Sequence, residues 1–96
     1  MEESIQLIHP AGKKAVNMPK VKYETIKNAL LNCLETNGEL THTELLLQIK
    51  EDFKKRRTEF EGSVEWYVEW VKLDLEARSK IRRLGDKQPL KYAIAH

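Results

Sequence analysis

The chain has 96 residues, a formal net charge of +2 and one cysteine, and 41% of its residues are hydrophobic while 33% are charged. These values fit one folded domain and exclude global disorder. Because we find no apolar run near the roughly 20 residues of a membrane span, no signal-peptide pattern and no second cysteine, we expect a single cytoplasmic domain over residues 1–96.

Residues 1–19 are expected to form an N-terminal extended or β segment. Ile5 and Leu7 alternate with polar residues, a His-Pro-Ala-Gly turn sequence follows, and a second short apolar stretch ends at Met18. This pattern predicts either a short β-hairpin or two loose extended segments. Pro19 stands near a helix entry, where a missing N–H costs nothing.

A first helix is predicted from about Val21 to Thr36, because apolar residues recur there at steps of three and four. Asn37-Gly38 then ends the helix, since glycine tolerates the left-handed conformation found at helix ends. Cys33 lies on the apolar face, and we interpret it as a small buried hydrophobic residue rather than a catalytic thiol.

A second helix is predicted to begin at a capping box, because Thr41 is followed three residues later by Glu44 and then by a leucine-rich run. This helix should extend to Lys54 or Lys55. His42 would lie exposed in its first turn. The few residues between the first two helices form a tight connection of the kind seen in helix-turn-helix units.

A third helix is predicted over Ser63–Arg78, with Ser63 as its N-cap. One apolar face should pack on the preceding helices and comprises Val64, Tyr67, Val68, Val71 and Leu75. A second apolar face comprises Trp66, Trp70, Leu73 and Ala77. Between the two faces lie Glu65, Glu69, Lys72 and Glu76. A helix that is apolar on two faces must be covered twice, so the second face should meet the N-terminal segment, the following hairpin or another chain.

The C-terminal residues predict a β-hairpin. Lys80–Leu84 and Leu90–Ile94 alternate between apolar and charged residues, and Gly85–Pro89 has turn chemistry. The hairpin should therefore have a charged outer face.

This order of elements resembles the winged helix-turn-helix fold over roughly residues 21–94. The run Leu73–Arg83 resembles the pattern that carries the third helix into the wing, and Gly38–Leu45 resembles the entry to the second helix. Ser79 stands where winged helices favour glycine. The resemblance implies an α+β fold: a winged helix-turn-helix with a three-helix core, a C-terminal β-hairpin wing and an N-terminal extended segment.

The chain is also similar to a family of small uncharacterised bacterial proteins. Members of that family share a Trp-rich third helix ending in Leu-Asp-Leu-Glu-Ala, followed by a Pro-Leu-Lys-aromatic sequence, here Pro89–Tyr92. That family has no established activity, so this resemblance implies no mechanism.

Weak binding of double-stranded DNA is the first functional hypothesis. The third helix of helix-turn-helix proteins enters the major groove, but here Glu61, Glu65 and Glu69 occupy that side and would repel phosphates. Cations flank the helix instead. The candidate phosphate contacts are Lys54, Lys55, Arg56, Arg57, Lys72, Lys80, Arg82, Arg83, Lys87 and Lys91. Binding through such contacts would be salt-dependent and mostly non-specific. For residues 54–57 the alternative is a solvated loop whose cations stabilise a helix C-terminus.

The second functional hypothesis is a protein-interaction or homodimerisation surface formed by Trp66, Trp70 and Leu73. Tryptophans are enriched at interface hot spots, and two of them left in water would be unusual. The alternative is that the N-terminal segment or the wing covers both. An acidic third helix also suits a basic partner.

An enzyme is not expected. The sequence has no glycine-rich phosphate loop and no CxxC pair, and His9, His42, His96 and Cys33 lack the spacing of zinc ligands. We therefore predict no catalytic residue, metal, cofactor or small-molecule substrate.

Overall fold

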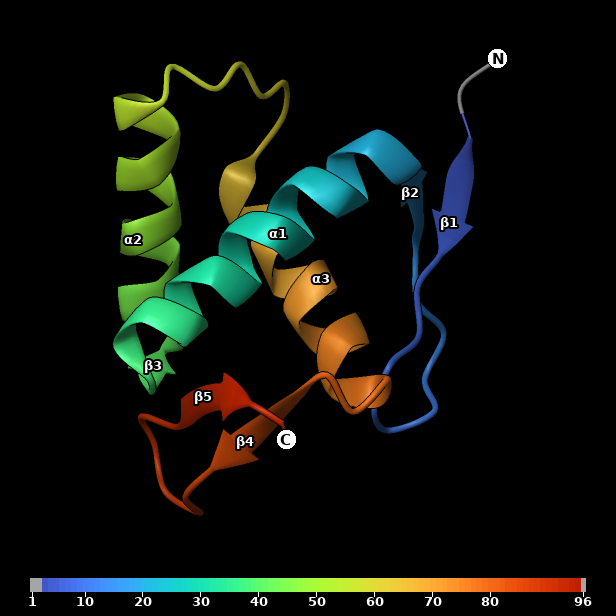
Figure 1. The fold of residues 1–96 in the computed structure, drawn as a ribbon. Coiled ribbons are helices and arrows are strands. Elements are labelled where there is room, and N and C mark those ends of the chain that lie inside the picture. The colour runs from blue at the N-terminus through green and yellow to red at the C-terminus, as the bar shows by residue number, and fades with distance from the viewer. Residues whose placement is uncertain (1–2, 96) are drawn as a thin grey trace.

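Residues 3–95, which the computed structural model describes, form an α+β fold with three helices and two small antiparallel sheets (Figure 1). Met1, Glu2 and His96 lie outside the described residues. The elements, in chain order, are β1 (Ser4–Gln6), β2 (Asn17–Pro19), α1 (Lys20–Asn37), β3 (Leu40–Thr41), α2 (His42–Lys55), α3 (Val64–Ala77), β4 (Ile81–Leu84) and β5 (Lys91–Ile94).

Residues 3–19, which we call the N-terminal arm, contain the first sheet. β1 pairs antiparallel with β2, so that Ile5 lies opposite Met18. The Leu7 N–H donates to the Val16 carbonyl at 3.0 Å and extends the pairing. Of the two arrangements that the sequence allowed, paired strands are the one observed. Leu7 and Met18 are 2% and 3% exposed, so the arm is part of the core.

The starts of α2 and α3 follow the predicted cap chemistry. The Glu44 N–H donates to the Thr41 hydroxyl at 3.2 Å, and the Thr41 N–H donates to the Glu44 carboxylate at 2.9 Å. These two bonds form the predicted capping box, and the bond from the Thr41 N–H lowers the pKa of the Glu44 carboxyl group. The Ser63 hydroxyl accepts from the Trp66 N–H at 3.2 Å, which confirms Ser63 as the N-cap of α3.

The end of α3 is closed by a serine in the left-handed conformation. Ser79 has φ 60°, its N–H donates to the Glu76 carbonyl at 3.1 Å, and the Lys80 N–H donates to the Leu75 carbonyl at 2.8 Å. These two bonds are the Schellman motif, in which glycine is the usual residue at this position. Ser79, which stands where the winged-helix pattern favours glycine, thus adopts the backbone conformation that glycine would have.

The second sheet has the strand order β3-β5-β4. The predicted hairpin is present as β4 and β5, with Arg83 opposite Tyr92. β3 was not predicted, because a two-residue strand has no alternation to detect in the sequence. It forms by pairing with a distant segment, so that Leu40 lies opposite Tyr92.

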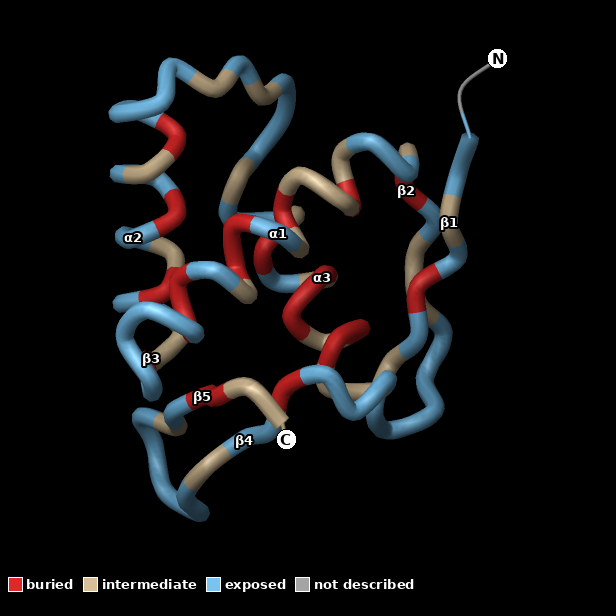
Figure 2. Tube along the Cα trace, viewed as in Figure 1, coloured by how far each residue is buried: buried red, intermediate tan, exposed pale blue. Residues whose placement is uncertain are grey.

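The core lies where the three helices face one another and where β5 packs on α1 (Figure 2). Its fully buried side chains include Ile26, Leu30, Leu45, Ile49 and Leu75. Cys33 is 8% exposed, in agreement with its predicted place on the apolar face, and burial raises the pKa of its thiol. In the described part of the chain, every helix is too short or too polar to cross a membrane.

Candidate functional site

The inner face of α3 is the one that the sequence predicted. Val68, Val71 and Leu75 are fully buried, while Val64 and Tyr67 are partly buried and pack against the core. This face fixes the rotation of α3 about its own axis. It thereby decides which side chains α3 turns away from the core.

The second apolar face of α3 is only partly covered. We call it the outer stripe, and it comprises Trp66, Trp70, Leu73 and Ala77. Trp66 is 43% exposed, whereas the other three are half-buried. Trp70 packs against the core, but neither the arm nor the hairpin covers Trp66 fully.

A chain of aromatic rings holds Trp66 in place. The Phe60 ring lies 5.8 Å from Phe53 in the core and 5.0 Å from Tyr67. The Tyr67 ring in turn lies 4.9 Å from the Trp66 ring at 78°, and the Trp66 and Trp70 centroids are 6.4 Å apart. These separations are typical of favourable aromatic pairs. Trp66 is therefore exposed yet anchored to the core through its neighbours.

The outer stripe has an acidic edge. Glu65 and Glu69 are exposed, and Glu76 is half-buried. The Arg83 guanidinium lies 3.1 Å from the Glu76 carboxylate. Among the described residues no salt bridge involves Glu65 or Glu69. The charge of Glu69 does act on the buried Lys72 ammonium, where it opposes the lowering of the pKa of Lys72 by burial.

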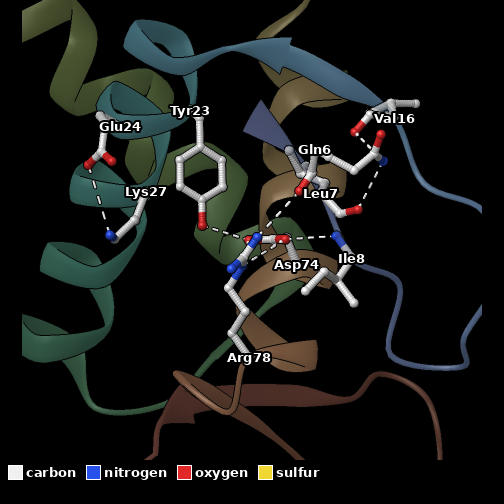
Figure 3. A network of polar contacts seen from close by, with 9 residues as sticks. All are labelled: Gln6, Leu7, Ile8, Val16, Tyr23, Glu24, Lys27, Asp74 and Arg78. Atoms are coloured by element: carbon white, nitrogen blue, oxygen red, sulfur yellow. Dashed lines mark hydrogen bonds and ion pairs between the residues drawn. The ribbon is translucent and has the colours of Figure 1, made fainter. Parts of the chain in front are cut away.

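The arm lies along the opposite edge of the outer stripe, where the side chain of Asp74 on α3 binds it (Figure 3). The fully buried Asp74 carboxylate accepts from the Ile8 N–H at 2.8 Å and from the Tyr23 hydroxyl at 2.6 Å. It also accepts from Arg78 Nε at 2.9 Å. Burial, reinforced by the bond to Asp74, raises the pKa of Tyr23. Our sequence analysis did not single out Asp74. The one signal available was its spacing of four residues from Arg78.

Lys72 lies beside Glu69 and Glu76, as the sequence predicted, but it is buried, and this corrects its proposed role as a phosphate contact. The residue is 5% exposed, so it cannot reach a phosphate in this structure. Its Nζ lies 2.9 Å from Nδ1 of His42 and 4.5 Å from the centroid of the Tyr92 ring. His42 is likewise half-buried rather than exposed as expected. Burial lowers the pKa of both groups.

The other predicted phosphate contacts are exposed but separate into two groups. They are Lys54, Lys55, Arg56 and Arg57 at the end of α2, and Lys80, Arg82, Arg83, Lys87 and Lys91 in the hairpin. In Figure 1 these groups lie at opposite ends of the molecule.

Even within the hairpin the cations face two ways, because successive strand residues point to opposite faces. Arg83 pairs with Glu76 on α3. Arg82 lines a hollow of about 330 Å³ together with Glu35 and Glu39 at the end of α1. The outer stripe, in contrast, brings all three predicted interface residues onto one face.

Among residues 3–95, no group of three or more His, Cys, Asp or Glu side chains is placed to hold a metal ion. The candidate sites that the predicted residues form are two kinds of surface: the outer stripe of α3 and the exposed cations at either end of the molecule.

No curated protein and no solved structure matches this chain. A family model does match, over residues 4–92, which include the arm from Ser4 onward, all three helices and the hairpin as far as Tyr92. The chain therefore belongs to this family of unknown function (DUF6958).

Proposed function

We propose that the chain is a winged helix-turn-helix domain that binds another protein through the outer stripe of α3. The order α1, β3, α2, α3 and β4–β5 hairpin supports the fold, as does the position of β3 beside β5 in one sheet. The fold alone does not decide the function, because winged helices serve in many roles.

The observation that carries the proposal is the exposure of Trp66. A tryptophan offers roughly 150–250 Å² of buriable surface, and 43% of this residue is exposed at the N-terminal end of an apolar helix face. Its ring is already ordered by Tyr67 and Trp70. A partner would thus gain apolar contact at a small cost in side-chain entropy, which is the property of an interface hot spot.

The charge of this face favours a protein over a nucleic acid. Glu65 and Glu69 border Trp66 on α3, and they would repel a phosphate backbone. The one cation that the sequence analysis placed beside them, Lys72, is buried. A protein surface can offer apolar groups to the stripe and cations to its edge, whereas a duplex cannot.

The test is a comparison of Trp66→Ala with Leu47→Ala. Leu47 is a matched control, because it is a 58% exposed apolar residue on α2. We expect a protein retained from a native cell extract by the wild type and by the control to be lost with Trp66→Ala. The dissociation constant, measured with that protein purified, should rise on the same substitution. Circular dichroism would verify that both variants remain folded.

The proposal fails if Trp66→Ala retains every protein that the wild type retains, with unchanged dissociation constants. In that case the exposed tryptophan would have no binding role, and the hairpin would become the leading candidate surface.

Weak nucleic-acid binding through the hairpin is a second candidate, which the exposure of its five cations favours. If about four cations met phosphates, log affinity would fall against log salt with a slope of about −3.6. Titration of a random-sequence duplex at about 50 and 200 mM salt tests this dependence. Arg82→Ala/Arg83→Ala should weaken the binding while Trp66→Ala leaves it unchanged. Absence of binding at the lower salt would exclude this function.

A further inference from the structure

The outer stripe has the spacing of a coiled-coil seam. Trp66, Trp70, Leu73 and Ala77 follow one another at steps of four, three and four residues. Alternating steps of three and four are how a helix presents apolar residues to a second helix packed along it. At a rise of 1.5 Å per residue the stripe is about 17 Å long, which is three turns of a partner helix.

The two edges of this seam differ. Glu69 and Glu76 each directly precede a seam residue, at the heptad positions whose charges select a helical partner. Glu65 lies one turn before Glu69 on the same side. On the other edge the arm approaches α3, where the Ile8 N–H donates to the Asp74 carboxylate. Ile8 itself is 46% exposed. The surface therefore has an acidic edge and an edge formed by the arm, where Asp74 is paired with Arg78.

We infer that the partner is a basic amphipathic helix, an assignment that rests on the proposed function of the outer stripe. Such a helix would place its own apolar three-four seam on Trp66, Trp70 and Leu73. It would place Lys or Arg along the side that meets Glu65 and Glu69. Complementary charge of this kind sets the register and orientation of a helix and speeds its association.

A second copy of this chain fits the seam less well. If two copies paired through antiparallel α3 helices, the acidic edge of one would face the acidic edge of the other. Like charges in that position oppose pairing. Neither Glu65 nor Glu69 forms a salt bridge among the described residues, and Lys72, the cation on which Glu69 acts, is buried in the fold. A second α3 therefore adds repulsion along this edge, whereas a basic helix adds attraction.

Three synthetic helical peptides of equal length test the inference. The first carries a leucine three-four seam flanked by Lys and Arg. The second has the same seam flanked by Glu, and the third has the composition of the first with the seam scrambled. Each fluorescently labelled peptide would be titrated with the full chain and its anisotropy followed. We expect the first peptide to bind at least about tenfold more tightly than either of the others.

Two substitutions locate the binding on the protein. Trp66→Ala should abolish binding of the basic seam peptide, and Glu69→Gln should weaken it several-fold. Glu51→Gln is the matched control, because Glu51 is an exposed acid on α2, and it should leave the affinity unchanged.

Equal affinity for the basic and acidic peptides would overturn the inference, as would binding that survives Trp66→Ala. A dimer in light scattering that dissociates on Trp66→Ala would also overturn it, because a second copy would then occupy the seam. If a cellular partner needs Trp66 but none of the peptides binds, the basic helix is excluded while the proposed function stands. If no cellular partner needs Trp66, the proposed function itself fails.

Discussion

Asp74 shows how a single buried carboxylate can join three segments of the chain. Its donors come from the arm (Ile8), from α1 (Tyr23) and from the end of α3 (Arg78). A buried charge is costly unless it is both paired and hydrogen-bonded, and Asp74 meets both conditions. Among the described residues no buried side-chain polar atom lacks a partner. Asp74 is therefore stabilising only as long as its donors remain in place.

At the scale of this residue we predict that Asp74→Asn destabilises the fold by about 2–4 kcal/mol. The amide removes the negative charge that Arg78 neutralises and turns a donor toward the Tyr23 hydroxyl or the arm. The measurement is the free energy of unfolding in urea.

Asp52→Asn is the matched control for that experiment. Asp52 also pairs with an arginine four residues later, Arg56, at 2.9 Å. The Arg56 side chain, however, is 67% exposed. A pair of this kind contributes about 0.5 kcal/mol or less. If both substitutions cost the same, burial of Asp74 would not be what makes its network important.

At the scale of elements, Lys72 links α3 to the start of α2 and to β5. Its ammonium donates to Nδ1 of the neutral His42 ring, which leaves the ring proton on Nε2. The same ammonium lies over the face of Tyr92. Protonation of His42 would put an N–H where this bond needs a lone pair, and it would set two cations 2.9 Å apart.

We therefore predict a loss of stability in mild acid that depends on His42. Burial and then the charge of Lys72 lower the pKa of His42 in the folded protein, against the opposing effect of Glu65 and Glu69. As the pH falls through about 6.5, the unfolded chain takes up the proton first, so stability falls with it. The loss ends once the pH is below the folded pKa, where both states are protonated.

The measurement is the free energy of unfolding of the wild type and of His42→Gln between about pH 7.5 and 5. Glutamine keeps an acceptor for Lys72 but does not titrate, so the slope should be shallower than in the wild type. Identical slopes for the wild type and His42→Gln would mean that the ring is protonated as easily folded as unfolded.

The same elements show what could be predicted from the sequence. Cap residues such as Thr41 and Ser63 marked the helix starts correctly, because a cap involves neighbours within one turn. The burial of Lys72 and the role of Asp74 could not be predicted in this way. A helical wheel places them at the edge of a face, but only tertiary packing brings His42 over one edge and Ile8 over the other.

For the candidate site, the sequence identified the residues of the outer stripe. It could not predict which segment covers them, because their exposure depends on the path of the arm and the hairpin. Trp66 proved exposed and Trp70 half-buried. The sequence identified the candidate cations but could not predict where each would lie in the folded molecule. Strand alternation and the length of α2 then divided those cations among separate surfaces.

Across the whole molecule, the charge has a pattern that the small net value conceals. Residues 59–78 carry six acids against two bases, and residues 79–96 carry five bases against one acid. In the structure, the cations of residues 54–57 and those of the hairpin lie at opposite ends of a molecule that measures 41 × 34 × 22 Å. This separation of the two basic groups, together with the exposed acids Glu65 and Glu69 on α3, supports our proposal of a protein partner that places cations on α3.

The arm and the helices share one core, so we predict that they unfold together. Leu7 is 2% exposed and packs in the same cluster as the side chains of α1 and α3. Leu7→Ala should cost about 2–5 kcal/mol, because it leaves a cavity in that cluster. The neighbouring Ile8 is 46% exposed, and Ile8→Ala keeps its backbone bond to Asp74, so it should cost about 0.5 kcal/mol or less.

Hydrogen exchange distinguishes a shared core from a peripheral arm: Leu7→Ala should reduce protection in α3 and β5 as well as in β1 and β2. Loss of protection confined to the arm would show that it folds onto an already stable three-helix unit.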